Sequence, residues 1–397
     1  MIMRLTEEQL NKVMKKYNTD RLWSFSRMNL FKTSPYSYYL KYIVQAKEDN
    51  DNSIYGVMGG CVHTILEKFY SDEIKYEDML DEFENAWMTN VDILDLKFDR
   101  TDGEKNNKIK DKYYKNLKHF FKNHKILEDK PKLEKFIITN IGDFYFQGYI
   151  DVINKDKNGV YNIIDWKTSS IYLGHKAEKE SFQLGIYAIG LNQMGVPLEN
   201  IRIKWNFLKY CTVYCEQANG KVKERNIERC ELGSKLLSNV KIWLKKFGYK
   251  DELDYYCSLL CDSNDLSCLP EEVQKKYVVT DCYVEVPITE KMISFWTKEI
   301  IETLTDITLR EKDYNETHSD KAFWDSEDTV KVSSYYFANL SGYSANLHKP
   351  YKEYLEKLER QKRENDDMLG VVNKSKVNNN SSTTEIDDED LEWLKYI

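Results

Sequence analysis

Two aspartates and a lysine stand at spacings that can build a catalytic site. Side chains on a β-strand repeat every second residue, so Asp165 and Lys167, in the apolar stretch Val160 to Lys167, point to the same face. The preceding stretch, Phe144 to Asp151, also alternates and ends in an acid. Two carboxylates can hold a hard divalent cation, which lowers the pKa of a bound water and clamps a phosphate. A nearby lysine can orient that water or neutralise charge on the phosphate.

The two acids become neighbours if residues 144–168 form a β-hairpin. Lys-Asn-Gly at 157–159 fits a three-residue loop in which Gly159 takes the left-handed conformation. Pairing within that hairpin places Asp151 opposite Asp165, with Cβ atoms roughly 4.5–5.5 Å apart, and a cation between them would remove their repulsion. Acids of a solvated hairpin can instead simply face water. An apolar strand is, however, a costly place for charges without a use.

Two further motifs flank this segment. A helix predicted over residues 57–70 carries His63 with an acid four positions later, and hence on the same face. A second helix, predicted over residues 177–194, places Gln183 and Tyr187 on one face in the same way. A lone helical histidine or a Gln and Tyr pair usually serves packing, so neither motif would indicate a site without the hairpin.

The four motifs together resemble the core of the PD-(D/E)xK nucleases, in the form found in RecB-like exonucleases and the related CRISPR adaptation nucleases. They occur in that family's order between residues 20 and 215, as a GGCVHTILE helix, GYID, IIDWKTS and QLGIY. The resemblance implies an α/β fold in which helices flank a mixed β-sheet. We expect additional helical regions at both ends of this core.

The resemblance also implies a role for each motif residue. Lys167 would activate water or stabilise the transition state, and Gln183 and Tyr187 would position the strand, so that these three form the catalytic set together with the two acids. The implied cofactor is Mg²⁺ or Mn²⁺. The implied metal ligands are His63, Asp151, Asp165 and the backbone carbonyl of Trp166.

The reaction implied by this resemblance is metal-dependent hydrolysis of phosphodiester bonds in DNA. RecB-like relatives act mostly as exonucleases, so we expect cleavage from single strands or duplex ends, in recombination, repair or replication. A structure-selective endonuclease is the alternative. A hypothesis of a different class is a non-catalytic subunit that binds DNA or assists assembly, but such a subunit has no need of opposed carboxylates.

An upstream segment, WSFSRMNLFKTSPYSYYLKYI, resembles one that packs beside the active site in RecB-like nucleases. On that basis we expect Ser24, Ser26 and Arg27 to contact DNA phosphates. The tyrosines that follow form a cluster that could stack unpaired bases. Core packing is the simpler role for most of them. The cluster consists of Tyr36, Tyr38, Tyr39 and Tyr42.

The net charge of −8 is unexpected for a DNA-binding enzyme, because affinity for phosphates comes largely from Lys and Arg. Acids are concentrated in residues 377–397, so the rest of the chain is closer to balance and can present a basic groove. A lysine run is one candidate source of that groove, and a solvated helix face explains the run equally well. The run consists of Lys105, Lys108, Lys110, Lys112 and Lys115.

Eight cysteines lack the spacing of a disulfide framework. Many relatives bind an iron–sulfur cluster through one cysteine before the histidine helix and three near the C-terminus. Here Ser34 stands where the first would be expected, and no cysteine follows Cys282. We therefore expect reduced thiols and no iron–sulfur cluster. Cys257, Cys261 and Cys268 are close together, which leaves another metal site open as the alternative.

Length and composition predict a large globular chain, with 397 residues of which 41% are hydrophobic. We expect a nuclease core with an N-terminal helical part over residues 1–230 and a mainly helical region over residues 231–369. No apolar run is long enough to cross a bilayer and the first residues are charged, so we expect a cytoplasmic protein without membrane contact. Abundant Asn, Lys and Tyr suggest an AT-rich genome, such as that of a bacteriophage, with the protein acting in a bacterial or phage-infected cell.

Residues 370–397 are expected to be a disordered linker and an acidic, hydrophobic tail. Apolar side chains that reappear after residue 385 are too few to build a core. The tail can dock on this same protein, or on a replication or recombination protein. Aromatic anchors usually carry most of the energy of a small interface, so Trp393 is the expected partner-binding residue.

Overall fold

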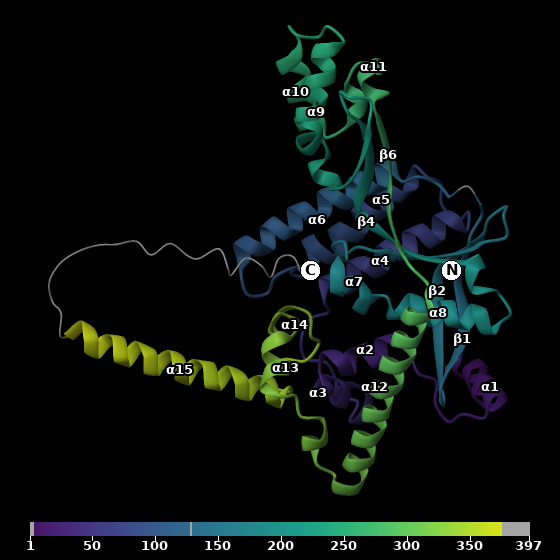
Figure 1. The fold of residues 1–397 in the computed structure, drawn as a ribbon. Coiled ribbons are helices and arrows are strands. Elements are labelled where there is room, and N and C mark those ends of the chain that lie inside the picture. Colours follow the sequence, from purple (N-terminus) through teal and green to yellow (C-terminus); the bar gives the residue numbers. More distant parts are fainter. Residues whose placement is uncertain (1–3, 128, 375–397) are drawn as a thin grey trace. The chain divides into compact units, whose positions relative to one another are not determined.

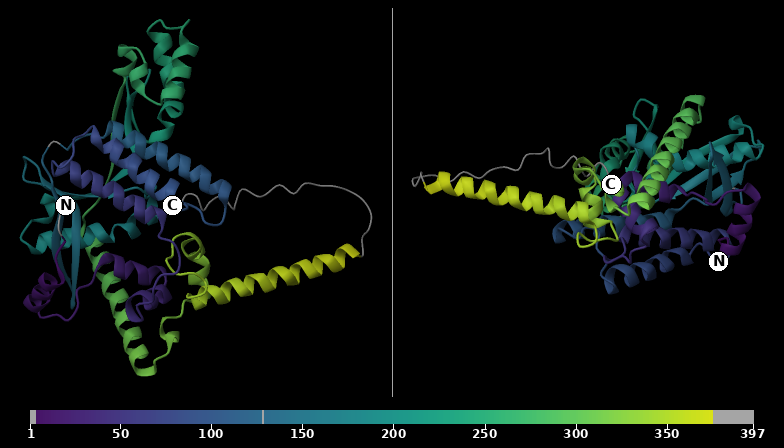
Figure 2. Two further views of the ribbon diagram at one scale, coloured as in Figure 1. Left: turned by 180° about the vertical axis from the view of Figure 1, so that it is seen from behind. Right: turned by 90° about the horizontal axis from the view of Figure 1, so that it is seen from below.

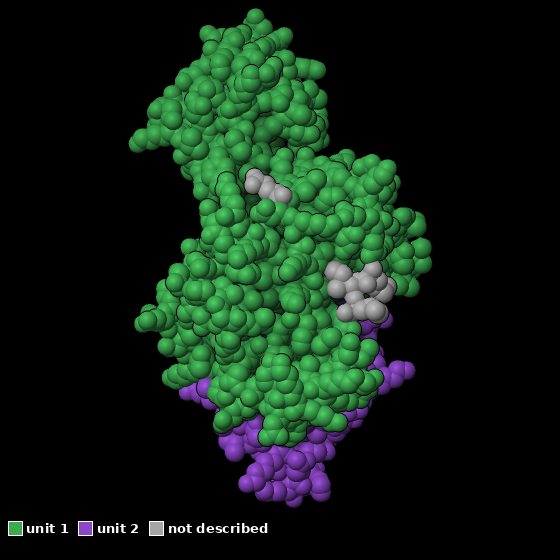
Figure 3. Space-filling model, turned by 90° about the vertical axis from the view of Figure 1, so that its right-hand side faces the viewer, with its two compact units in different colours: residues 1–23, 54–298 green, residues 24–53, 299–397 purple. Residues whose placement is uncertain are grey.

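The computed structural model describes residues 4–127 and 129–374. They belong to two compact units, neither of which is continuous in sequence (Figure 3). The predicted division after residue 230 falls inside the first unit. Most of the expected tail, including Trp393, lies outside the described residues. The first unit comprises residues 1–23 and 54–298, and the second comprises residues 24–53 and 299–397.

Within the described residues, the first unit is built on a six-stranded mixed β-sheet (Figure 1). The strand order is β1-β2-β3-β4-β5, and β6 pairs with β4. β3 and β4 are parallel, and the other paired strands are antiparallel. Helices flank this sheet, so the predicted fold class is confirmed. The strands are β1 (Lys132–Ile141), β2 (Phe144–Lys155), β3 (Tyr161–Lys167), β4 (Ile201–Glu216), β5 (Val222–Glu228) and β6 (Tyr277–Val286).

β2 and β3 form the predicted hairpin. Val152 pairs with Ile164, which is the expected register, and Gly159 takes a left-handed φ of 84° in the loop. The backbone pairing ends at this level, one position before Asp151 and Asp165 would pair. Beyond that point the side chain of Asp151 on β2 bonds to the backbone of β3.

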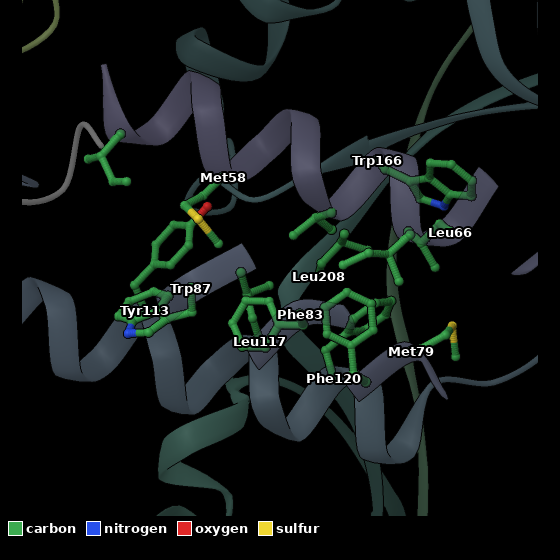
Figure 4. Packing of buried hydrophobic residues seen from close by; sticks show 14 of the residues in the cluster. Met58, Leu66, Met79, Phe83, Trp87, Tyr113, Leu117, Phe120, Trp166 and Leu208 are labelled. Carbon is green, nitrogen blue, oxygen red and sulfur yellow. The ribbon is translucent and has the colours of Figure 1, made fainter. Parts of the chain in front are cut away.

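A layer of helices covers the face of the sheet that carries Ile164 and Trp166. The left panel of Figure 2 shows this layer toward the viewer. Its apolar side chains and those of the sheet form one large core, in which Leu66, Trp166 and Leu208 meet aromatic rings of the helices (Figure 4). Each fully buried side chain of this size contributes roughly 1.5–3 kcal/mol, which holds the helices firmly on the sheet. The layer consists of α4 (Ile54–Tyr70), α5 (Asp78–Trp87) and α6 (Gly103–Asn123).

The segment between β3 and β4 is two helices rather than the single helix predicted over residues 177–194. They are α7 (Gly174–Glu180) and α8 (Phe182–Gln193). The break falls at Ser181, whose hydroxyl donates to the carbonyl of Glu178 at 2.5 Å and so competes with the helical hydrogen bonds. α8 packs against β1 to β4. Because it is bonded to Lys167, which points away from Trp166, α8 covers the other face of the sheet.

β4 is long enough to leave the main sheet and enter a small lobe (Figure 1). There β5 and β6 pair with its second half. Helices pack on this extension around a separate apolar core that includes Leu236 and Leu260. The lobe helices are α9 (Leu232–Lys246), α10 (Leu253–Ser263) and α11 (Glu271–Gln274).

The second unit is helical in its described part. Its residues Tyr36 and Tyr38 are buried and pack against Trp324 and Phe323, which supports core packing for these two tyrosines. The helix predicted over residues 350–369 extends further, to Lys374. Its helices are α2 (Phe25–Thr33), α3 (Pro35–Tyr38), α13 (Glu327–Val332), α14 (Ser334–Asn339) and α15 (Lys349–Lys374), and α12 (Glu290–Thr317) enters it at residue 299. The chain starts with α1 (Glu7–Tyr17), which Thr6 caps as predicted and which belongs to the first unit.

Candidate active site

The two acids of the hairpin lie in the interior of the first unit. Asp151 and Asp165 are 9% and 3% exposed. Where the backbone pairing of β2 and β3 ends, the Asp151 carboxylate accepts a hydrogen bond from the Trp166 backbone amide at 3.1 Å. Burial raises the pKa of Asp151 well above its usual value, and the negative charge of Asp165 adds to this effect. Burial and the neighbouring charge of Asp165 therefore disfavour the ionised form of Asp151.

His63 reaches the same place from α4. Its Nε2 lies 3.0 Å from the Trp166 carbonyl oxygen and its Nδ1 lies 3.6 Å from a carboxylate oxygen of Asp151. Burial lowers the pKa of His63, although the charge of Asp165 opposes the effect. A neutral imidazole is the form that binds a metal ion.

Lys167 points to the face that carries Asp165. Its Nζ is 2.7 Å from Asp165 Oδ2 and donates to Gln183 Oε1 at 3.3 Å. Burial alone would lower the pKa of Lys167, but Asp165, Tyr172 and Asp151 together outweigh burial and the pKa is raised. The ammonium is therefore charged at neutral pH and held by two side chains.

Gln183 and Tyr187 extend this contact along α8. The Gln183 amide donates to the Tyr187 hydroxyl at 3.2 Å, and that hydroxyl donates to the Tyr149 carbonyl at 2.9 Å. The Tyr187 ring lies directly over Gly148, where a Cβ atom would stand only 2.5 Å from the ring. Glycine is thus required at position 148, three residues before Asp151, because any side chain there would displace Tyr187.

α8 is itself fixed by a close contact on its other side. A Cβ atom at Gly185 would lie 2.5 Å from the Trp296 ring, and the Trp296 indole donates to the Ser181 hydroxyl at 2.8 Å. Trp296 belongs to the first turns of α12 that lie in the first unit. This packing holds Gln183 and Tyr187 at a fixed distance from the hairpin.

Glu134 is an acid of this site that the sequence alone did not indicate. It lies on β1 between the pairs Leu133–Val152 and Lys135–Ile150, and hence across from Asp151. Its side chain is 6% exposed, its φ is 44°, and Arg4 makes an ion pair with it at 3.2 Å. Its charge contributes to the raised pKa of Asp151. In the sequence, Glu134 is an acid within a strand pattern, and acids at such positions are too common to indicate a site.

These residues fit a hard divalent cation by their chemistry. Two carboxylates, a neutral imidazole and a backbone carbonyl are suitable donors for Mg²⁺ or Mn²⁺. The unbalanced negative charge around Asp151 is the observation that favours a cation. In the described residues no three His, Cys, Asp or Glu side chains already stand as a coordination shell. Asp165 is instead turned to Lys167, and Asp151 to the Trp166 amide.

Ser24, Ser26 and Arg27 lie in the second unit, at the start of α2. The Ser24 hydroxyl accepts from the Arg27 amide at 3.2 Å and lies 3.1 Å from the Ser26 hydroxyl. The Arg27 guanidinium donates to the Tyr38 hydroxyl at 2.7 Å and to Glu311 at 3.4 Å. These bonds give the residues a role in their own unit, and their contact with DNA stays a prediction.

The lysine run is an ion-paired helix face. Each lysine of the run from Lys105 to Lys115 has its Nζ between 2.5 and 3.0 Å from a carboxylate oxygen. The alternative of a solvated helix face therefore explains the lysine run. A basic groove for DNA would have to be formed by other residues.

The described cysteines are free thiols. Cys257 is buried, Cys261 is exposed and Cys268 is intermediate. Since no group of three metal-binding side chains is arranged around a common point in the described part of the chain, these residues give the alternative metal site no support. The expected lack of an iron–sulfur cluster stays a prediction.

Two carboxylates and a lysine on adjoining strands of a mixed sheet, together with a histidine from the helix that packs on it, form the arrangement of a hydrolytic enzyme site. The chain belongs to the PD-(D/E)XK nuclease superfamily, whose family model matches residues 22–248, more than half of the sequence. Nucleases of this superfamily generally use divalent ions such as Mg²⁺ and act on DNA. None of the curated proteins compared with the chain matches it significantly. No helix within residues 4–127 and 129–374 has the length and apolar character needed to span a membrane.

The charge on Asp151 leads to a prediction for the metal-free protein. Asp151→Asn is expected to raise the free energy of unfolding at pH 7, because the ionised carboxylate is buried near Asp165 without a cation. Asparagine removes that buried charge, so the urea midpoint of the variant should lie above that of the wild type. Urea unfolding in EDTA measures it. Because the folded pKa is raised, the gain should shrink as pH falls towards the unfolded value near 3.8.

Addition of a metal ion should stabilise the wild type more than Asp151→Asn. Mg²⁺ or Mn²⁺ at about 100 times Kd should stabilise the wild type by roughly 2.7 kcal/mol and Asp151→Asn much less. Asp143→Asn, an exposed acid in the turn between β1 and β2, is the control and should behave as the wild type in both experiments. A variant at Asp151 that is less stable without metal would contradict the assignment of the acid as a metal ligand.

Proposed function

We propose that this protein is a metal-dependent deoxyribonuclease of the RecB-like group, acting as an exonuclease on single strands or duplex ends. One observation supports it above the others: Asp151, Asp165 and Lys167 converge with His63 in one buried site. A binding protein gains nothing from two buried acids whose repulsion must be offset. The proposed site residues are those of the four motifs, with Glu134 added.

Each residue would have a distinct task in hydrolysis. His63, Asp151, Asp165 and the Trp166 carbonyl would hold the ion, which when bound supplies an activated water and neutralises phosphate charge. Lys167, charged and held by Asp165, would face the charge that develops on the phosphate in the transition state. Gln183 and Tyr187 would fix the path of the strand. Glu134 already makes an ion pair with Arg4, so it would act on the metal ligands through its charge and not by direct coordination.

The test uses DNA substrates that differ only in their ends. Labelled single-stranded and double-stranded DNA, linear and circular, would be incubated with Mg²⁺, Mn²⁺ or EDTA. We expect linear molecules to be shortened from their ends in either metal, and circles to remain intact. Cutting of circles would favour the structure-selective endonuclease. Binding without cleavage in either metal would favour the non-catalytic subunit.

We further propose that the C-terminal tail docks a partner protein of replication or recombination. The support comes from the sequence: acids of residues 385–392 lead into an apolar end that contains Trp393. Deleting residues 385–397 should leave the cleavage of short naked oligonucleotides within about twofold of the wild type, because the tail would contribute nothing to the site. A large loss of activity or of thermal stability on that deletion would favour docking of the tail on its own protein.

A further inference from the structure

A second set of lysines lies next to the active site, at the end of β3. In the parallel pairing of β3 and β4, Lys167 is the partner of Phe207. Lys209 is two residues further along β4, roughly 7 Å beyond that pair at the rise of a strand. β3 has ended at this level, so Lys209 lies beside the loop that follows the catalytic lysine. A strand bound at Lys167 would pass this position.

Lys176 approaches the same place from α7. Its Nζ lies 5.3 Å from the centroid of the Tyr172 ring. Tyr172 packs edge-on against Trp205 and Phe207, and it is close enough to Lys167 to affect the pKa of that lysine. Burial lowers the pKa of Lys176. Tyr172 is thus near both Lys167 and Lys176, and Lys176 is near enough to Lys209 to affect its pKa.

Lys209 is half-buried among charges that do not neutralise it. Its Nζ lies 5.4 Å from the centroid of the Tyr113 ring. The nearby acid, Glu228, is 2.5 Å from Lys112 and accepts from the Tyr210 hydroxyl at 3.1 Å. Among the described residues Lys209 has no carboxylate within ion-pairing distance, whereas each lysine of the run on α6 has one.

The charge balance around Lys209 favours an anion. Burial lowers the pKa of Lys209 to about 8; Glu228 opposes this, while the positive charges of Lys112 and Lys176 add to it, and Cys230 opposes it again. The positive charges of Lys112 and Lys176 thus disfavour the charged form of Lys209, and a bound anion would favour it. The loop beside them, Thr168-Ser169-Ser170, supplies hydroxyl groups, which commonly contact DNA phosphates.

We propose that Lys209 and Lys176, with the hydroxyls of residues 168–170, bind phosphates of the substrate strand next to the phosphate that is hydrolysed. This inference rests on the proposed function and adds the path by which the strand leaves the site. It would also supply positive charge beside the proposed catalytic lysine in a chain whose net charge is −8.

The experiment compares Lys209→Ala, Lys176→Ala and Lys209→Arg with the wild type. Binding of a labelled single-stranded oligonucleotide would be measured in EDTA over a range of salt concentrations, and cleavage in Mg²⁺ or Mn²⁺. Each alanine variant should weaken binding and raise KM about three- to tenfold with little change in kcat, and should reduce the slope of log affinity against log salt by about one. Lys115→Ala removes an exposed lysine of α6 that pairs with Asp111, and should change neither quantity.

The pH dependence separates phosphate binding from packing. As pH rises from 7 to 9, Lys209 loses its charge, so wild-type affinity should fall more than that of Lys209→Arg, which stays protonated. If the wild type cleaves DNA but the alanine variants keep its KM and salt slope, the inference is overturned and the proposed function stands. A lower melting temperature with an unchanged salt slope would assign Lys209 a structural role and also overturn it. If the wild type neither binds nor cleaves DNA, the proposed function itself has failed.

Discussion

Replacing Lys167 with alanine is expected to reduce DNA cleavage by roughly 10²–10³-fold while the protein stays folded and still binds DNA. The ammonium lies 2.7 Å from Asp165 and 3.3 Å from Gln183, so its loss leaves the acid and α8 in place and removes only the charge. An interaction made chiefly in the transition state affects kcat more than binding. Single-turnover cleavage of an end-labelled oligonucleotide measures the chemical step, and binding in EDTA measures affinity.

Lys204→Ala provides a matched control for that experiment. Lys204 is a partly buried lysine of the neighbouring strand, whose Nζ lies over the Tyr283 ring and donates to Asn162, outside the candidate site. It should leave cleavage nearly unchanged. Asp165→Ala should be at least as severe as Lys167→Ala, because it removes a metal ligand together with the partner of the lysine. Cleavage by Lys167→Ala at a near wild-type rate would remove the lysine from the catalytic set.

The hairpin could be predicted because everything that fixes it is local. Alternation defines β2 and β3, Gly159 sets the loop, and the loop sets the register. The predicted register is the observed one, but the backbone pairing ends one position before Asp151, whose carboxylate accepts a hydrogen bond from the Trp166 amide. A bond between a side chain and the backbone at the end of a hairpin leaves no signal in the alternation of the sequence.

The residues that sequence reasoning missed depend on contacts between distant segments. Glu134 becomes part of the site only because β1 pairs with β2 across from Asp151. Lys209 gains its position from the parallel pairing of β3 and β4. The lysine run on α6 can be seen in the sequence. Whether its lysines are ion-paired depends on acids that folding brings to them, such as Glu228 and Asp99. Motif order predicted the candidate catalytic residues, whereas the charge balance around them required the structure.

The largest effect on stability is expected from Arg229→Ala. The Arg229 side chain is 1% exposed, its Nη2 lies 2.6 Å from Asp281, and its Nε donates to the Leu208 carbonyl at 2.9 Å. That carbonyl lies where the pairing of β4 and β6 shifts register, so the guanidinium satisfies a backbone group that the sheet leaves free. Asp281 also lies 2.8 Å from His124 Nδ1. Removing the arginine would leave a buried carboxylate without its main counter-charge.

A loss of about 3–5 kcal/mol is therefore expected for Arg229→Ala in urea unfolding at pH 7. Burial alone would raise the pKa of Asp281, but the hydrogen bond with His124 and the charge of Arg229 outweigh it and the pKa is lowered. The contribution of Asp281 is thus present above the unfolded value near 3.8 and is lost as pH falls through the folded value, so the difference between variant and wild type should narrow in acid. Arg225→Ala, at a partly buried position of β5 where the guanidinium donates to the Lys235 carbonyl at 3.2 Å, should cost much less, about 1 kcal/mol. The double variant Arg229→Ala, Asp281→Ala should lose less than the sum of the two single changes, because removing the acid also removes the unpaired charge. Additive losses would show that the two residues stabilise the sheet independently and that the ion pair does not hold β6 to β4.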